Sequence, residues 1–154
     1  MRLLRYRPRS VAEVRRRLLA LGFTNEEVDE AIATAEAAGL LNDKIFAKLL
    51  VEDRLLHHPL SRRAIAQELA DKGIDKAIAD AALEELYPVE KEKEVALSLA
   101  QTRLARYASL DRDKRMQRTI SFLIRRGFNA ALAGQVVRGV IERSSERENK
   151  ELND

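Results

Sequence analysis

The sequence predicts an all-α fold built from three related helical units, of which the last is incomplete. Glycine and proline together make only 9 of 154 residues, and Ala, Leu, Arg and Glu outnumber the strand-favouring Val, Ile and Thr. A repeat at a spacing of about 50 residues is typical of arrays of similar helical units. Because 45% of the residues are apolar, the chain can also bury a core.

The repeat is centred on three glycines, Gly22, Gly73 and Gly127, which are 51 and 54 residues apart. A leucine stands four residues before each glycine, a large apolar residue follows it, and a short polar residue that can cap a helix comes next. We therefore expect a helix, a glycine stop and a second helix in every unit, with a third helix in the first two units.

The first three-helix repeat is expected to span residues 1–58. Ser10 with Glu13 forms a capping box that starts a helix ending near Leu21, and Thr24 with Glu27 starts a second helix that stops at Gly39. Asn42 or Asp43 caps a third helix, which ends before Pro59. The residues expected to face the core are Val11, Val14, Leu18, Leu21, Val28, Ala31, Ile32, Ala35, Ile45, Phe46, Leu49, Leu50 and Leu56.

The second three-helix repeat is expected to span residues 59–108. Its first helix starts at Ser61 and stops at Gly73, and Asp75 caps the next helix. Pro88 opens a longer third helix that runs to about Tyr107. The residues expected inside are Ile65, Leu69, Ile78, Ala82, Leu83, Leu86, Leu97, Ala100, Leu104 and Tyr107.

The third repeat, with two helices, is expected to span residues 109–143. Its first helix starts near Asp111 and stops at Gly127, and Asn129 caps the last helix. From Arg143 onwards the sequence has almost no apolar content, so we expect a disordered tail over 144–154. The expected core residues are Met116, Ile120, Leu123, Leu132, Val136, Val137, Val140 and Ile141.

Charge alternates along the chain although the net charge is only +3. Residues 1–24 carry +6, 25–53 carry −6, 54–74 carry +2, 75–94 carry −4 and 95–128 carry +6, so the first helix of each unit is its basic one. Arginine outnumbers lysine by 20 to 8, and arginine suits forked contacts to phosphate or carboxylate.

The residue inventory argues against an enzyme, a cofactor site and a metal site. The chain has no cysteine, no phosphate-binding GxxxxGK[ST] loop and no histidine placed for a catalytic triad. His57 and His58 are adjacent on a helix, so they point apart and have no further ligand. No apolar run is long enough to span a membrane, which favours a cytoplasmic protein.

The order of motifs resembles the RecX family, bacterial regulators of the RecA recombinase, from about Leu3 to Ile141. The marks are Arg9–Ser10 with Glu13–Val14, Leu18 and Gly22–Phe23; Gly39–Leu40–Leu41–Asn42–Asp43 with Phe46–Ala47, Val51 and Arg54; Ile65 with Gln67–Glu68–Leu69 and Lys72–Gly73–Ile74; and Phe122–Leu123 with Arg125–Arg126–Gly127–Phe128.

The resemblance implies an elongated, curved array of three-helix repeats that binds the RecA–single-stranded-DNA filament in its groove. It further implies inhibition of recombinase, ATPase and co-protease activities in DNA repair, recombination and the SOS response. The expected partners are the RecA filament and, weakly, single-stranded DNA, with no membrane partner and a monomeric chain. The alternative is a helical DNA-binding protein that acts without RecA.

Arginines are the candidate contacts to DNA or to the filament, because their forks suit phosphates. Phe122 shares a helical face with several of them, which suits base stacking, although a core role for this ring is favoured. Arg115, Arg118 and Arg125 are expected to be exposed on one face, opposite Met116, Ile120 and Leu123. The candidate residues are Arg5, Arg7, Arg9, Arg15, Arg16, Arg17, Arg62, Arg63, Arg103, Arg106, Arg115, Arg118, Arg125 and Arg126.

Overall fold

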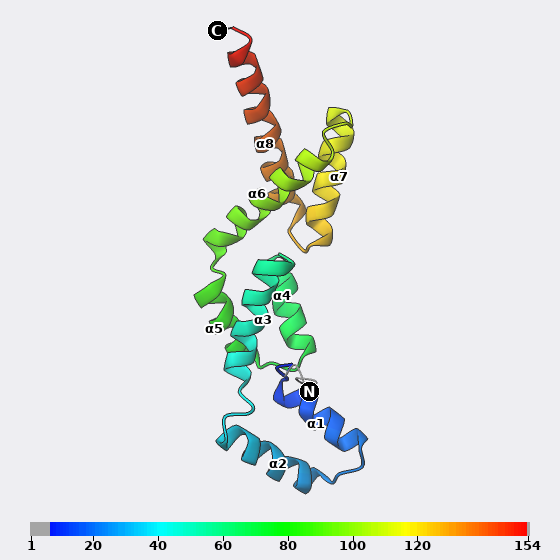
Figure 1. The fold of residues 1–154 in the computed structure, drawn as a ribbon, viewed down its shortest axis with the longest axis vertical. Helices are drawn as coiled ribbons and strands as arrows, with labels where there is room; N and C mark the ends of the chain where they lie inside the picture. Colours follow the sequence, from blue (N-terminus) through cyan, green and yellow to red (C-terminus); the bar gives the residue numbers. More distant parts are fainter. Residues whose placement is uncertain (1–6, 154) are drawn as a thin grey trace, which may run out of the picture. The chain divides into compact units, whose positions relative to one another are not determined.

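A computed structural model describes residues 7–153 of the chain, which form eight α-helices and no strand (Figure 1). The all-α repeat fold is therefore confirmed. The helices are α1 (Val11–Ala20), α2 (Asn25–Ala37), α3 (Asp43–His57), α4 (Arg62–Asp71), α5 (Lys76–Leu86), α6 (Val89–Arg106), α7 (Arg112–Arg125) and α8 (Ala130–Glu151).

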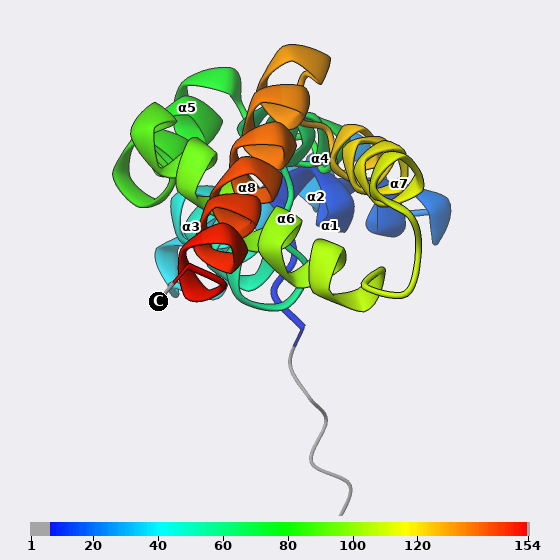
Figure 2. The same cartoon turned by 90° about the horizontal axis from the view of Figure 1, so that it is seen from above.

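The chain divides into two compact bodies, called unit 1 and unit 2 from here on, which do not coincide with the three repeats. The division falls inside helices α3 and α4. Unit 1 comprises residues 1–53 and 66–86, and unit 2 comprises residues 54–65 and 87–154. In unit 1, α1 packs against α2, while in unit 2 helices α6, α7 and α8 pack against one another (Figure 2).

Short-range capping signals in the sequence position most of the helix starts. Ser10 and Glu13 form the expected capping box on α1, and Thr24 and Glu27 form the second on α2. Asn42 caps α3, since its Oδ1 accepts the backbone N–H groups of Lys44 and Ile45. The local pattern alone left the choice between Asn42 and Asp43 open.

Asp43 makes a different contact, which connects the third helix of the first repeat to the first helix of that repeat. Its Oδ1 accepts the backbone N–H of Val11 at 2.9 Å, at the start of α1. Glu92 in the first turn of α6 does the same at the start of α4, accepting the N–H of Arg62 at 3.1 Å. A carboxylate at a helix N-terminus satisfies an orphan donor and complements the helix dipole.

Each unit also contains a contact between the start of a repeat's first helix, α1 or α4, and the turn that holds a repeat glycine, Gly73 or Gly127. In unit 1 the Ser10 hydroxyl donates to the Lys72 carbonyl at 2.6 Å, and Lys72 Nζ pairs with Glu13 at 3.1 Å. A Cβ atom at Gly73 would lie 2.3 Å from the Cβ of Ala12. In unit 2 the Ser61 N–H donates to the Arg126 carbonyl at 3.0 Å, beside Gly127.

Four glycines, Gly22, Gly39, Gly73 and Gly127, have a positive φ, between 72° and 94°. At Gly73 and Gly127 the close approach of another helix adds a second requirement for glycine. The repeated Gly in the sequence thus marks a backbone turn and, at these two positions, a packing contact.

Unit 1 buries its apolar residues around α2 and α3, and the structure corrects several expected core positions. Val28, Ile32 and Leu41 form a buried cluster against Val11, Val14 and Leu18, which are half-buried. Leu21, Ala31, Ile45, Leu49 and Leu56 are exposed rather than buried. Helix α3 is apolar on two sides, and it turns Phe46, Ala47 and Val51 inward, so Ile45, Leu49 and Leu56 lie on its opposite side.

Unit 2 has a core formed by α6, α7 and α8. Ala100 and Leu104 of α6 meet Phe122 and Leu123 of α7, and Val136, Val137 and Ile141 of α8 complete the cluster. Met116 and Ile120 are only half-buried and pack on its margin. Among residues 7–153, no helix is both long enough and apolar enough to cross a bilayer.

Helix α8 continues to Glu151, which differs from the disordered tail expected over 144–154. The physical reason is that this segment consists mainly of Glu, Arg, Lys and Ser, and the first three have high helix propensity even without an apolar face. Its residues from Glu142 to Asn153 are exposed, as their polarity requires.

Candidate nucleic-acid interface

The arginines at the start of the chain and on α1 provide the candidate contacts of unit 1. Arg5 lies outside the described residues, and Arg7 and Arg9 are exposed. On α1, Arg16 and Arg17 are exposed, whereas Arg15 donates to Asp29 of α2 at 2.5 Å.

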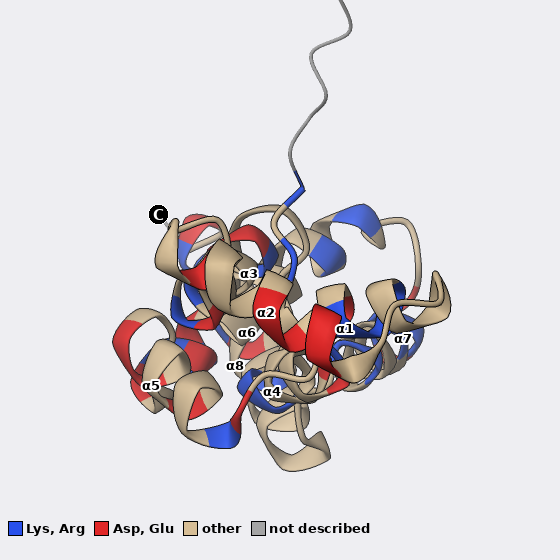
Figure 3. Ribbon diagram, turned by 90° about the horizontal axis from the view of Figure 1, so that it is seen from below, with Lys and Arg blue, Asp and Glu red and all other residues tan. Residues whose placement is uncertain are grey.

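Acidic residues of α2 therefore lie next to the basic helix α1 (Figure 3). The pair of Arg15 with Asp29 is exposed at both side chains, by 41% and 63%, so it contributes little to stability. It does, however, lower the positive potential that an approaching phosphate would meet on this side of α1.

Arg62 is held in place by hydrogen bonds of unit 2 rather than presented to a ligand. Its Nε donates to the Tyr87 carbonyl at 2.7 Å, and Tyr87 is fully buried with its hydroxyl donating to the Leu60 carbonyl. Burial, with the neighbouring Glu92, raises the pKa of the Tyr87 hydroxyl far above its ordinary value, so this group stays neutral. Arg63, by contrast, is exposed.

Phe122 lies in the core between two arginines, so it offers no ring for base stacking. Only 6% of Phe122 is exposed, and the guanidinium carbons of Arg103 and Arg126 lie 3.9 Å and 4.9 Å from its ring centre. This geometry is that of a cation–π pair on each arginine. The core role that the sequence favoured for Phe122 is confirmed.

Arg126 has several partners in unit 2. Its Nη1 donates to the Pro59 carbonyl at 3.0 Å, and its own carbonyl accepts the N–H of Ser61. Burial, together with the charge of nearby Arg103, lowers the pKa of Arg126. Two like charges that converge on one ring leave this point of α6 and α7 favourable for an anion.

The expected exposed face of Arg115, Arg118 and Arg125 is wrong for Arg115. Arg115 is half-buried, its Nη2 donates to the Leu104 carbonyl of α6, and its Nε is buried without a partner among the described residues. On a helix, Arg115 lies on the same side as Thr119 and Phe122, and that side faces the core. Arg118 and Arg125 lie further round α7 and are exposed.

Five arginines, on α6, on α7 and at the C-cap of α7, remain as the strongest candidate contact surface, which we call the α6–α7 arginine face. It consists of Arg103, Arg106, Arg118, Arg125 and Arg126. The two helices pack together, Arg103 and Arg126 share the Phe122 ring, and Arg118 lies 5.9 Å from the ring of Tyr107.

Acidic residues are rare in this part of the sequence, where Asp111 and Asp113 are the only two between residues 95 and 141. Residues 95–110 and 114–141 contain neither Asp nor Glu, in contrast to α1, whose neighbour α2 is acidic. Figure 3 shows the basic residues of α7 in blue and the acidic residues of α2 in red. The face can therefore attract and hold phosphate groups through arginine forks.

Three further arginines escaped the sequence reasoning. Arg112, Arg143 and Arg147 line a cavity of unit 2 with Arg115. The spacing of Arg143 and Arg147, four residues apart on one helix, would have been the signal. It was missed because that segment was expected to be disordered. Among residues 7–153, no group of three or more potential metal ligands occurs.

Comparisons with known proteins identify the family. Models of the RecX family match residues 1–34 as its first three-helix domain, 42–83 as its second and 90–137 as its third. Each matched segment contains one of the three repeat glycines, Gly22, Gly73 and Gly127.

Similar curated proteins are named Regulatory protein RecX. That of Streptomyces coelicolor is 36% identical over 95% of this chain and 77% of its own length. That of Mycobacterium ulcerans is 33% identical over 99% of this chain and 87% of its own length. The crystal structure of RecX from Lactobacillus salivarius has a TM-score of 0.72 and 26% identity, and the match covers 88% of each chain. The chain therefore belongs to the RecX family of regulatory proteins.

Proposed function

We propose that this chain binds the filament that the RecA recombinase forms on single-stranded DNA and restrains its activity. The chain's place among regulatory RecX proteins supports this function. The single observation that carries it is the α6–α7 arginine face, where five arginines gather in a stretch of sequence, residues 95–141, whose only acidic residues are Asp111 and Asp113. The protein acts as a monomer in the cytoplasm, where it meets the filament.

The arginine face suits a phosphate backbone rather than a particular base sequence. Arg103 and Arg126 are already engaged on the Phe122 ring, which leaves Arg106, Arg118 and Arg125 as the exposed members. None of these three side chains is buried, so no surroundings fix its orientation for the recognition of a particular base. Three exposed phosphate contacts give only weak, salt-dependent binding to bare DNA.

Binding to a filament is stronger than to bare DNA because the filament offers repeated sites. A chain that contacts neighbouring RecA protomers through more than one of its repeats gains affinity from effective concentration, without any new contact. Occupation of the groove then limits filament extension and strand exchange. The exposed Arg16 and Arg17 of α1 supply a second set of contacts in unit 1.

Sedimentation tests this function against the alternative of a DNA-binding protein that acts without RecA. The chain is mixed with single-stranded DNA, with and without RecA and a slowly hydrolysed ATP analogue, at the same salt concentration. We expect the RecA filament to retain the chain under conditions where bare DNA does not. Equal retention by bare DNA would favour the RecA-independent alternative and contradict the proposal.

A further inference from the structure

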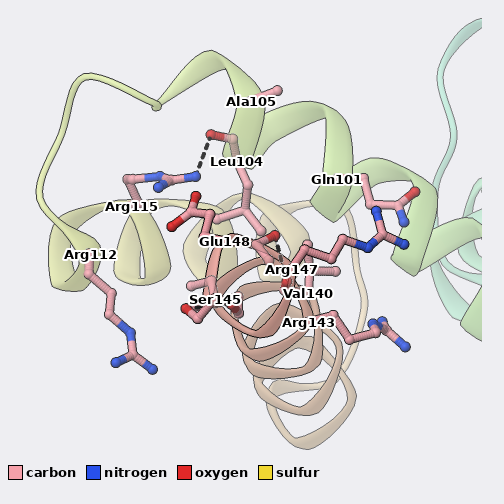
Figure 4. Close-up of a pocket in the computed structure, with 12 residues that line it drawn as sticks. Gln101, Leu104, Ala105, Arg112, Arg115, Val140, Arg143, Ser145, Arg147 and Glu148 are labelled. Atoms are coloured by element: carbon pink, nitrogen blue, oxygen red, sulfur yellow. Dashed lines mark hydrogen bonds between the residues drawn. The ribbon is translucent and has the colours of Figure 1, made fainter. Parts of the chain in front are cut away.

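Unit 2 contains a cavity of about 460 Å³ between α6, α7 and α8, whose lining shares no residue with the arginine face (Figure 4). This volume falls within the range of sites that hold small ligands or a few side chains. Its lining combines charged side chains at the rim with aliphatic side chains below them, so both kinds of group constrain the ligand.

The rim of the cavity carries four arginines and a single acidic residue. Arg112 and Arg115 come from α7, Arg143 and Arg147 come from α8, and Glu148 is the acidic one. No ion pair within residues 7–153 involves any of the four arginines. The cavity thus has an uncompensated positive charge, which selects an anionic ligand.

Among the four arginines, Arg115 is the one with a buried side-chain nitrogen that lacks a hydrogen-bond partner in the described part of the chain. Its Nη2 reaches the Leu104 carbonyl only at 3.4 Å, which is long for a hydrogen bond. Its Nε is buried and has no partner in the described part of the chain. An unpaired buried donor is costly, so a ligand that brings an acceptor to this guanidinium is favoured.

The floor of the cavity favours a peptide over a nucleic acid as the anionic partner. Leu104, Val140 and Ile141 line it, and no aromatic side chain does. The hydroxyls of Ser144 and Ser145, which also line it, already donate to carbonyls of their own helix. Without an aromatic ring the site has no platform for a base, whereas the aliphatic floor suits an aliphatic side chain.

From these observations we propose that the cavity binds an acidic peptide segment of a partner protein, in which carboxylates alternate with aliphatic residues. Arg143 and Arg147 are one helical turn apart, about 6 Å. Alternate side chains of an extended peptide are separated by a similar distance, about 6.6 Å, so two carboxylates can each face one arginine. The proposal stands independently of filament binding.

Fluorescence anisotropy on the full chain tests it with a labelled heptapeptide in which Asp, Leu, Glu, Leu and Asp stand between terminal glycines. The matched neutral peptide has Asn and Gln in place of Asp and Glu. We expect the acidic peptide to bind and the neutral one not to bind. Equal binding of the two peptides, or no binding of the acidic one, would overturn the proposal.

Two double variants of α8 then locate the site. R143A/R147A removes two rim arginines, and R138A/K150A removes the same charge from exposed residues that do not line the cavity. We expect R143A/R147A to weaken acidic-peptide binding about tenfold, and R138A/K150A to weaken it less than about twofold. Equal weakening by the two variants would show general charge attraction only and contradict the cavity.

An oligothymidylate competitor separates a peptide site from a nucleic-acid site. We expect it to leave the bound acidic peptide in place at low micromolar concentration, and to bind R143A/R147A as tightly as wild type. Displacement of the peptide by the oligonucleotide, with loss of oligonucleotide binding in R143A/R147A, would assign the cavity to phosphates instead and overturn the proposal.

Discussion

Replacement of Gly73 by alanine tests the contact between the start of α1 and the α4–α5 turn. Gly73 has a φ of 75°, and a Cβ atom there would lie 2.3 Å from the Cβ of Ala12. Gly39 is the matched control in the same unit: its φ is 72°, and a Cβ atom would meet nothing within 4 Å. The two substitutions therefore share the backbone strain and differ only in the packing conflict.

The magnitudes follow from these two contributions. A left-handed conformation costs an alanine about 1–2 kcal/mol, so G39A should lower the free energy of unfolding by about that amount. The Cβ–Cβ overlap at Gly73 adds about 1–3 kcal/mol of overpacking, which gives about 2–5 kcal/mol for G73A. Ala12→Gly removes the atom that conflicts and by itself costs about 0.5–1 kcal/mol within a helix.

The assay is urea denaturation followed by circular dichroism, because the chain has no tryptophan. We expect G73A to be destabilised by about 1–3 kcal/mol more than G39A. We also expect A12G/G73A to be no less stable than G73A, because the overlap is absent. Equal destabilisation by G39A and G73A, with no rescue in A12G/G73A, would show that α1 does not approach this turn so closely.

Leu69→Ala should lower the free energy of unfolding by about 2–5 kcal/mol in urea, because Leu69 is fully buried, and filament inhibition should fall with it; a denaturation curve equal to that of wild type would contradict this. Although burial opposes it, the Ser10 N–H and the Lys72 ammonium lower the pKa of Glu13 below its ordinary value of 4.5. This contribution to stability is complete above pH 4.5 and is lost as pH falls through the lowered pKa, so E13Q should reduce the acid dependence of unfolding, and an unchanged dependence would refute it. Affinity for bare single-stranded DNA should be weak and fall steeply with salt, whereas an affinity that is constant between low and physiological salt would refute phosphate contacts. R106A/R118A/R125A, the face variant, should keep its helicity while the slope of log affinity for the filament against log salt flattens by up to about three; an unchanged slope would place the contacts elsewhere.

Local chemistry explains which parts of the fold were predictable from the sequence. Helix starts and stops depend on residues within a few positions of each other, so Ser10 with Glu13, and Gly22 before Thr24, were found directly. The hydrogen bond from Ser10 to Lys72 joins residues 62 positions apart, and no local pattern contains it. The sequence therefore located the repeat glycines without showing what packs against them.

The residue types of the candidate site were predictable from the sequence, whereas the direction in which each helix turns its arginines was less so. The arginine-rich helices were evident, but the orientation of α7 decides which arginines are free. A rotation of some tens of degrees separates half-buried Arg115 from exposed Arg118 and Arg125, and a helical wheel without a neighbouring helix does not fix it. Similarly, α3 has apolar residues on two sides, so periodicity did not reveal which side Phe46 and Val51 would bury.

Engagement of the filament by the α6–α7 arginine face is tested most directly by the rate at which RecA hydrolyses ATP on single-stranded DNA, titrated with three forms of this chain. They are the wild type, the face variant R106A/R118A/R125A, and a control, K44A/K93A/K150A, that loses the same charge at exposed lysines outside the face. We expect wild type and control to slow hydrolysis at similar concentrations. The face variant should require about tenfold more protein, a loss of about 1.4 kcal/mol in binding free energy. A face variant as potent as the wild type would contradict the claim that the α6–α7 arginine face engages the filament.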